Sequence, residues 1–191
     1  MVLLCLPDTA DWVSRTRQFS TGFPMSFILS AQRDNGLSEN LRANWERYQA
    51  QLKAAEDRLP SSAFKLATSD WWYAPDRPEA PHDSRLLGVR IRDVGAGTYE
   101  SNSKSEIEVE LHSAYEGTIC LHYPTVYQYA FTMPAQADGV HNDWRYDEFR
   151  VTEAPGRILH VIEWACGAVW QIEASDLIHE YIPPSGSDQN G

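Results

Sequence analysis

Four side chains of the types that bind metal ions alternate along two neighbouring predicted strands: Glu110, His112, Cys120 and His122. Carboxylate, imidazole and thiolate groups are ligands for zinc and iron, and two strands of a sheet can present three of them to one ion. The tighter motifs HExxH and paired CxxC do not occur in the chain. A metal-binding protein or metal-dependent enzyme is therefore the alternative hypothesis. A solvated strand face without a cofactor is the favoured interpretation.

Two histidines lie beside carboxylates in predicted loops. His82 precedes Asp83 in a proline-rich loop, and His141 lies two residues before Asp143, where a strand beginning near Trp144 is expected. A histidine next to a carboxylate can act as a general base. However, neighbours in a chain do not generally point at each other, and no GxSxG elbow or Cys–His arrangement supplies a nucleophile. We expect loop residues that cap turns, and we assign no catalytic residue.

The acidic residues are concentrated in the second half of the chain. The 191 residues carry a formal net charge of −11; residues 1–98 are balanced, whereas residues 99–191 hold 4 Lys/Arg against 15 Asp/Glu. A field of this sign repels phosphate backbones and attracts basic proteins or cations. No GxGxxG or GxxxxGK[ST] motif is present, so neither nucleic-acid nor nucleotide binding is expected.

These features favour a non-catalytic protein that binds a basic protein partner, for example a toxin-neutralising (immunity-type) bacterial protein. Acidic surfaces steer basic partners and raise association rates. The predicted binding residues are Glu106, Glu108, Glu110, Asp143, Trp144, Tyr146, Asp147 and Glu148, with His82, Asp83 and His141 in the loops.

The cysteines and the N-terminus indicate a cytoplasmic protein. Cys5, Cys120 and Cys166 are far apart and odd in number, as expected for free thiols in a reducing compartment. The apolar run at residues 1–6 is too short to span a membrane and lacks the parts of a signal peptide.

One helix followed by many short strands predicts an α+β domain. An apolar stripe runs over residues 38–58, with Ser38 as N-cap and Pro60 ending the helix. Strands are expected at residues 63–73, 85–94, 106–114, 118–123, 126–133, 143–151, 157–164, 168–173 and 177–182. This pattern favours an N-terminal helix packed on a mainly antiparallel β-sandwich or open β-barrel.

The predicted domain organisation is simple. Residues 1–34 form a poorly structured N-terminal extension, residues 35–182 a single domain that is β-rich from residue 63, and residues 183–191 a flexible tail.

Alternation of apolar and polar residues predicts the register of one hairpin. A three-residue loop (residues 115–117) with Gly117 in a left-handed conformation puts both apolar sets on one face. The predicted pairs are Leu111 with Leu121, Val109 with Tyr123, His112 with Cys120, and Glu110 with His122.

Two later strands have unusual patterns. Trp144 and Tyr146 are at even-numbered positions, whereas Phe149 and Val151 are at odd-numbered positions, so the two pairs would lie on opposite faces of a regular strand. A bulge near residues 147–148 would return all four to the core face, and bulges often lie near binding sites; alternatively, both faces are covered. Residues 158–164 are apolar on both faces, as in a central strand covered twice.

Several motifs between Trp71 and Tyr181 resemble those of a group of uncharacterised bacterial β-rich proteins. They are PHD at residues 81–83, HYP at 122–124, NDWRYDE at 142–148, IEW at 162–164 and IEASD at 172–176. This resemblance implies no known activity, and the first 60 residues lie outside it.

Overall fold

The computed structural model describes residues 26–29, 38–95, 103–135 and 139–184. Its helical elements are α2 (Ser38–Ala54), the 3-10 turn η2 (Glu56–Arg58) and α3 (Ser61–Ala67). Its strands are β1 (Arg85–Val94), β2 (Lys104–His112), β3 (Thr118–Phe131), β4 (Trp144–Val151), β5 (Ile158–Trp164), β6 (Val169–Ala174) and β7 (Ile178–Ile182). The predicted α+β class with a β-rich antiparallel part is confirmed.

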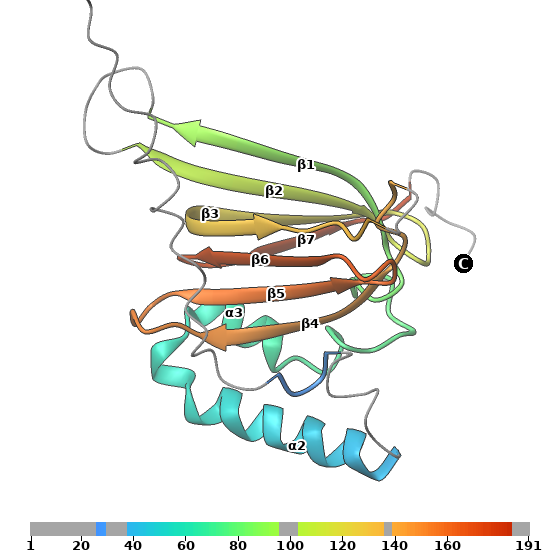
Figure 1. Ribbon diagram of the computed structural model, residues 1–191, viewed down its shortest axis with the longest axis vertical. Helices are drawn as coiled ribbons and strands as arrows, with labels where there is room; N and C mark the ends of the chain where they lie inside the picture. Colours follow the sequence, from blue (N-terminus) through green and yellow to red (C-terminus); the bar gives the residue numbers. More distant parts are fainter. Residues whose placement is uncertain (1–25, 30–37, 96–102, 136–138, 185–191) are drawn as a thin grey trace, which may run out of the picture.

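All seven strands belong to one antiparallel sheet, so the two packed sheets of a sandwich are not found in the described part of the chain. The order is β1-β2-β3-β6-β5-β4, with β7 also paired to β3 (Figure 1). Residues 118–122 of β3 pair with β7, and residues 126–131 pair with β6. β6 and β7 therefore flank β3 end to end on the side opposite β2. This order leaves β1 and β4 at the two edges of the sheet.

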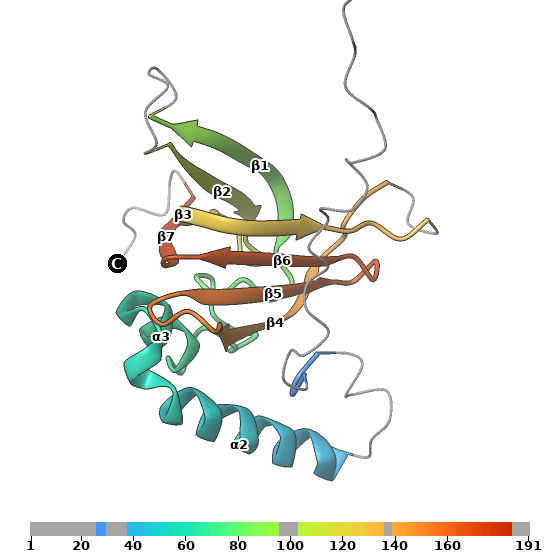
Figure 2. The ribbon, with the colours of Figure 1, turned by 60° about the vertical axis from the view of Figure 1, so that its left-hand side comes forward.

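The helices lie beside the β4 edge, with α2 running below β4 in Figures 1 and 2. The apolar stripe predicted over residues 38–58 is buried at Tyr48 and Leu52 of α2 and at Ala55, which follows it. The Tyr48 hydroxyl accepts a hydrogen bond of 2.7 Å from the backbone N–H of Phe149 in β4. The α-helix ends at Ala54, and η2 covers the rest of the predicted range.

The strand predicted at residues 63–73 is wrong, because this region contains α3 and a turn. Pro60 precedes the helix, where its missing N–H costs nothing. Ala63 and Ala67, one helical turn apart, are fully buried. The Asp176 carboxylate accepts a hydrogen bond from the Ala63 N–H at 3.1 Å, which satisfies a free donor in the first turn.

The strands predicted at residues 118–123 and 126–133 are one strand, β3, which continues through Pro124. The register between β2 and β3 shifts between Ser105 and Ile107, so Pro124 lies where the ladder is irregular. The other predicted strands agree with β1, β2, β4, β5, β6 and β7 to within two residues at each end.

The predicted β2–β3 hairpin places the correct side chains on each face of the sheet, but its register is wrong. Leu111 pairs with Ile119 and Val109 with Leu121, so the pairing is shifted by two residues. The loop comprises residues 113–117 and is closed by a hydrogen bond from the Ser113 N–H to the Gly117 carbonyl. Gly117 has the predicted positive φ, at 80°.

β5 is buried along its whole length, as predicted for a strand covered on both faces. On one face Leu29 packs against Leu159 and Val161. Residues 26–29, here called the N-terminal strap, therefore belong to the packed structure, contrary to the predicted extension over residues 1–34. The rest of that range, and residues 185–191 of the predicted tail, lie outside the described residues.

No helix within the described ranges has the length and apolar character needed to cross a membrane.

Candidate functional site

The acidic side chains predicted as a docking face on β2 are paired with arginines of β1. Arg90 and Arg92 lie opposite Glu108 and Glu106 in the register. Arg90 Nη1 is 3.0 Å from Glu108 Oε2, Arg92 Nη2 is 3.8 Å from Glu106 Oε2, and Arg92 also contacts Glu108. His122 Nε2 lies 3.5 Å from Glu106. This part of the sheet therefore carries cancelling charges instead of an uncompensated negative field.

The side chains considered as metal ligands do not converge in the observed register. Glu110 lies opposite Cys120, whereas His112 lies opposite Thr118 at the end of the strand, so the predicted pairing of His112 with Cys120 is wrong. Among the described residues, no group of three or more His, Cys, Asp or Glu side chains is arranged to hold a metal ion. Burial raises the pKa of the Cys120 thiol, and nearby carboxylates, that of Glu110 first, raise it further.

β4 contains a bulge, but it lies at Arg145, between Trp144 and Tyr146, and not near residues 147–148. Trp144 pairs with Trp164, and Asp147 pairs with Ile162 after the irregularity. The bulge therefore does not return all four apolar residues to one face: Tyr146 packs with the separate cluster around Leu159 and Val161.

The Asp147 carboxylate is almost fully buried and lies within hydrogen-bonding distance of two indole N–H groups and an imidazole. It accepts hydrogen bonds from Trp72 Nε1 at 3.0 Å and from Trp144 Nε1 at 3.2 Å. His160 Nε2 lies 3.0 Å from Oδ2, and His160 Nδ1 lies 2.7 Å from the Tyr123 hydroxyl. This order of groups is that of a carboxylate–histidine relay, but Tyr123 and His160 are both 0% exposed. Burial also raises the pKa of Tyr123 well above its usual value, so the network holds the core and presents no nucleophile.

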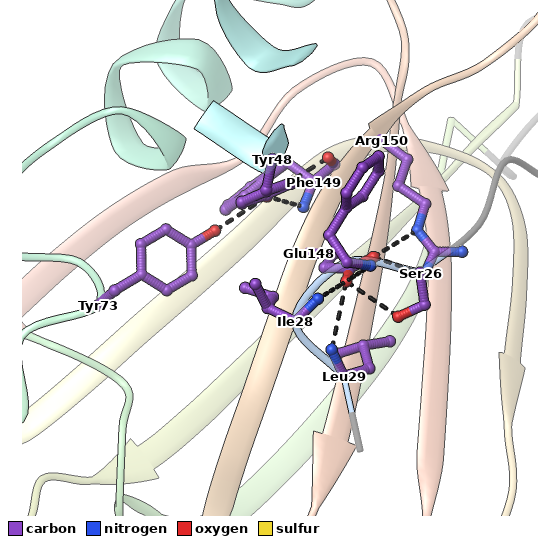
Figure 3. A network of polar contacts seen from close by, with 9 residues as sticks. Ser26, Ile28, Leu29, Tyr48, Tyr73, Glu148, Phe149 and Arg150 are labelled. Carbon is purple, nitrogen blue, oxygen red and sulfur yellow. Dashed lines mark hydrogen bonds and ion pairs between the residues drawn. The ribbon is translucent and has the colours of Figure 1, made fainter. Parts of the chain in front are cut away.

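The Glu148 carboxylate, 0% exposed, fastens the N-terminal strap to β4. Oε1 accepts hydrogen bonds from the backbone N–H groups of Phe27 (2.6 Å), Ile28 (2.6 Å) and Leu29 (3.3 Å) and from the Ser26 hydroxyl (3.0 Å). Oε2 accepts from Arg150 Nε at 2.9 Å and Nη2 at 2.6 Å (Figure 3). Glu148 is therefore a structural residue and not part of a docking surface.

A pocket of about 290 Å³ lies at the β4 edge, with walls from the strap, α2, the loop after α3, and β4. We call it the β4-edge pocket. Its lining residues are Ile28, Trp45, Trp72, Tyr73, Pro75, His82, Trp144, Arg145, Tyr146 and Asp147. Five of them are aromatic. The pocket brings together four residues of the predicted binding set: His82, Trp144, Tyr146 and Asp147.

The two predicted histidine loops meet in the backbone, but only one histidine reaches the pocket. The Asp83 N–H donates to the Trp144 carbonyl at 2.9 Å, and the Trp144 N–H donates to the Ser84 carbonyl at 2.8 Å. These bonds bring His82 to the pocket wall next to Tyr146, with 6.2 Å between the ring centroids.

Asp143 and His141 lie apart from the β4-edge pocket. Asp143 forms an ion pair with Arg85, with 3.1 Å between Oδ1 and Nε. His141 Nε2 accepts a hydrogen bond of 3.2 Å from Trp170 Nε1. Burial lowers the pKa of His141, as suits an imidazole that accepts a hydrogen bond from an indole.

Arg145 is the exposed charge at the β4-edge pocket. Its guanidinium carbon lies 5.5 Å from the centroid of the Tyr146 ring, and no described carboxylate pairs with it. The nearby acids predicted to make this edge negative are buried (Asp147, Glu148) or paired (Asp143). The charge that a ligand meets at the pocket is therefore positive, opposite to the predicted sign.

Sequence reasoning missed six of the ten lining residues, namely Ile28, Trp45, Trp72, Tyr73, Pro75 and Arg145. The run Trp71-Trp72-Tyr73 before the proline-rich loop was the available signal, since aromatic side chains next to a loop are common in binding sites.

No family model, curated protein or solved structure matches this chain. The resemblance to a group of bacterial β-rich proteins therefore stays a prediction.

Proposed function

We propose that the protein is a non-catalytic binding protein that recognises a protein partner through an aromatic or apolar side chain inserted into the β4-edge pocket. The observation that supports this proposal is a preformed pocket lined by five aromatic side chains, of which Trp45, Tyr73 and Tyr146 are partly exposed, together with the polar side chains of His82 and Arg145. Mostly apolar pockets with a few placed polar groups are the usual form of ligand sites. Buried aromatic contacts also supply most of the affinity in many protein interfaces.

The chemistry of the lining favours binding over catalysis. Among the described residues, the side chains that line the pocket include no serine, threonine or cysteine. The one carboxylate among the described lining residues, that of Asp147, accepts hydrogen bonds from two indoles and lies within hydrogen-bonding distance of His160. A carboxylate engaged in this way is a poor general base, because a proton acceptor needs a free lone pair directed at the substrate.

The proposal changes the basis on which a partner would be recognised. The expectation of a basic partner rested on an acidic face, and Glu106 and Glu108 of that face are neutralised by β1. An anchor side chain in an aromatic pocket does not depend on that face. A toxin-neutralising role is one biological form of such binding.

Titration of the full chain, labelled with ¹⁵N, with 4-methylphenol tests this proposal. This probe is the side chain of tyrosine and has about eight non-hydrogen atoms, so at roughly 0.5 kcal/mol per atom a dissociation constant of about 1 mM is expected. The indole N–H signals of Trp45, Trp72 and Trp144 should shift together and saturate.

The variant Trp45→Ala should weaken binding about tenfold, because it removes one aromatic wall and the contact area that the wall provides. The matched control is Tyr129→Ala, which removes an aromatic ring that is 45% exposed on β3, three strands from β4. Equal effects of the two variants, or shifts confined to residues outside the pocket, would contradict the proposal.

A further inference from the structure

The bulge in β4 determines where Arg145 lies. An extra residue in an edge strand turns its side chain out of the regular alternation, and such bulges often direct a side chain into a site. Here the irregularity falls between Trp144 and Tyr146, and the residue between them lines the β4-edge pocket.

Arg145 differs from the other arginines in residues 99–191. Arg150 is paired with Glu148 at 2.6 Å, and Arg157 is paired with Glu173 at 3.2 Å. Arg145 is exposed, and within the described residues no carboxylate lies within ion-pair distance of it. In a chain with net charge −11, an arginine that has no carboxylate partner among the described residues and lies beside an aromatic pocket is a ready receptor for an anion.

The competing possibility is a cationic ligand held by the aromatic rings, since such rings also bind ammonium groups. Among the described lining residues, Asp147 would have to supply the opposing charge, but it is 2% exposed and is held by Trp72, Trp144 and His160. Arg145, which lines the pocket, would in addition repel a cation. The arrangement of charges therefore favours an anion.

We infer that the ligand of the β4-edge pocket carries a carboxylate next to its aromatic group, and that Arg145 binds this carboxylate while the rings enclose the aromatic group. A planar guanidinium matches a carboxylate with two parallel hydrogen bonds, and one guanidinium suffices for a single negative charge. This inference rests on the proposed function. In a protein partner the carboxylate comes either from a C-terminal aromatic residue or from an acidic residue that follows an aromatic one.

The test compares four probes by NMR titration of the full chain. N-acetylphenylalanine carries a terminal carboxylate, and acetyl-Phe-Asp-amide carries one on the following side chain. Acetyl-Phe-amide is neutral, and phenethylamine is cationic. At low salt, the better of the two carboxylate probes should bind about tenfold more tightly than the neutral amide, the advantage expected for one charge-assisted pair. The identity of that probe indicates which source of carboxylate the pocket prefers.

The variant Arg145→Gln should remove the advantage of the carboxylate probes, and Arg145→Lys should keep part of it, because lysine retains the charge without the planar pair of donors. Arg145 is exposed, so neither change should disturb folding. The matched control Arg90→Gln removes one positive charge on β1 at the opposite edge of the sheet and should leave the advantage intact.

The outcomes separate this inference from the proposed function. If all three phenylalanine probes bind at the pocket equally, or if phenethylamine binds most tightly, the carboxylate assignment is overturned while the aromatic pocket stands. If Arg145→Gln and Arg90→Gln reduce the advantage equally, the effect is one of overall charge, and the assignment to Arg145 is overturned. If no probe shifts the pocket signals, the proposed function fails as well.

Discussion

Replacing Glu148 with glutamine should detach the N-terminal strap. The carboxylate is fully buried and accepts four hydrogen bonds on Oε1 and two from Arg150 on Oε2. Glutamine keeps one oxygen and replaces the other with an NH₂ group, which donates and cannot accept. Either the strap N–H groups or the Arg150 guanidinium then face another donor.

The size of the effect follows from burial. Breaking a buried ion pair by removing one partner costs about 3–5 kcal/mol, because the remaining charge is left uncompensated. The side chain of Arg150 is 11% exposed, so water compensates little of this loss. The oxygen that glutamine keeps can still serve one side of the network. We therefore expect Glu148→Gln to lower the free energy of unfolding by about 3 kcal/mol.

Urea denaturation measures the loss, and Glu173→Gln is the matched control. Glu173 also pairs with an arginine, but the side chains of that pair are 34% and 21% exposed, so about 0.5 kcal/mol is expected. Hydrogen exchange at the Phe27, Ile28 and Leu29 amides should accelerate selectively in Glu148→Gln. A loss within 1 kcal/mol of the control, with unchanged exchange at the three amides, would refute the assignment of Glu148 as the anchor of the strap.

Further predictions concern the buried carboxylate of β4, a partly buried histidine and a loop glycine. Asp147→Asn should cost about 2–4 kcal/mol, because the amide cannot accept from all the donors around it, and urea denaturation should show this loss. Burial lowers the pKa of His179 below its usual 6.5, so the unfolded chain takes up this proton first as pH falls. The contribution of His179 is complete above about pH 6.5 and is lost below it, so the wild-type chain should lose more free energy of unfolding between pH 7 and pH 5 than His179→Gln. A Cβ on Gly117 would meet a backbone oxygen at 2.6 Å, whereas a Cβ on Gly139, with the same φ of 80°, would meet nothing within 4 Å. Gly139→Ala should therefore cost about 1–2 kcal/mol from φ alone, and Gly117→Ala measurably more in the same assay.

The strands were predictable where one face of the sheet is covered and the other is not. Alternation located β2 and fixed which side chains of Ile107, Val109 and Leu111 face the core. The same alternation could not choose between loops of three and five residues, because both keep the parity. The helix α3 was missed because a short apolar run fits either period, and the contact of Ala63 with Asp176 joins residues far apart in the chain.

The neutralisation of the acidic face was within reach of the sequence. Arg90 and Arg92 alternate on β1 as Glu106 and Glu108 alternate on β2, and the two strands are consecutive in the chain. Counting charge by halves of the chain concealed this match, because the arginines belong to the balanced first half.

The β4-edge pocket was only partly predictable. The residues in the NDWRYDE motif contribute its β4 wall, and His82 was found as a loop residue. Ile28, Trp45 and Trp72 come from three further segments, and no local pattern shows that these segments meet. The position of the bulge at Arg145 depends on pairing with β5, which also lies outside local reasoning.

The most direct test of the binding pocket is to locate a bound aromatic probe by intermolecular nuclear Overhauser effects in the full chain. The ring protons of N-acetylphenylalanine should show contacts with the Trp45 indole and with Tyr73 of the β4-edge pocket. Contacts instead with the exposed apolar side chains of β1, such as Val89 and Ile91, would contradict the account.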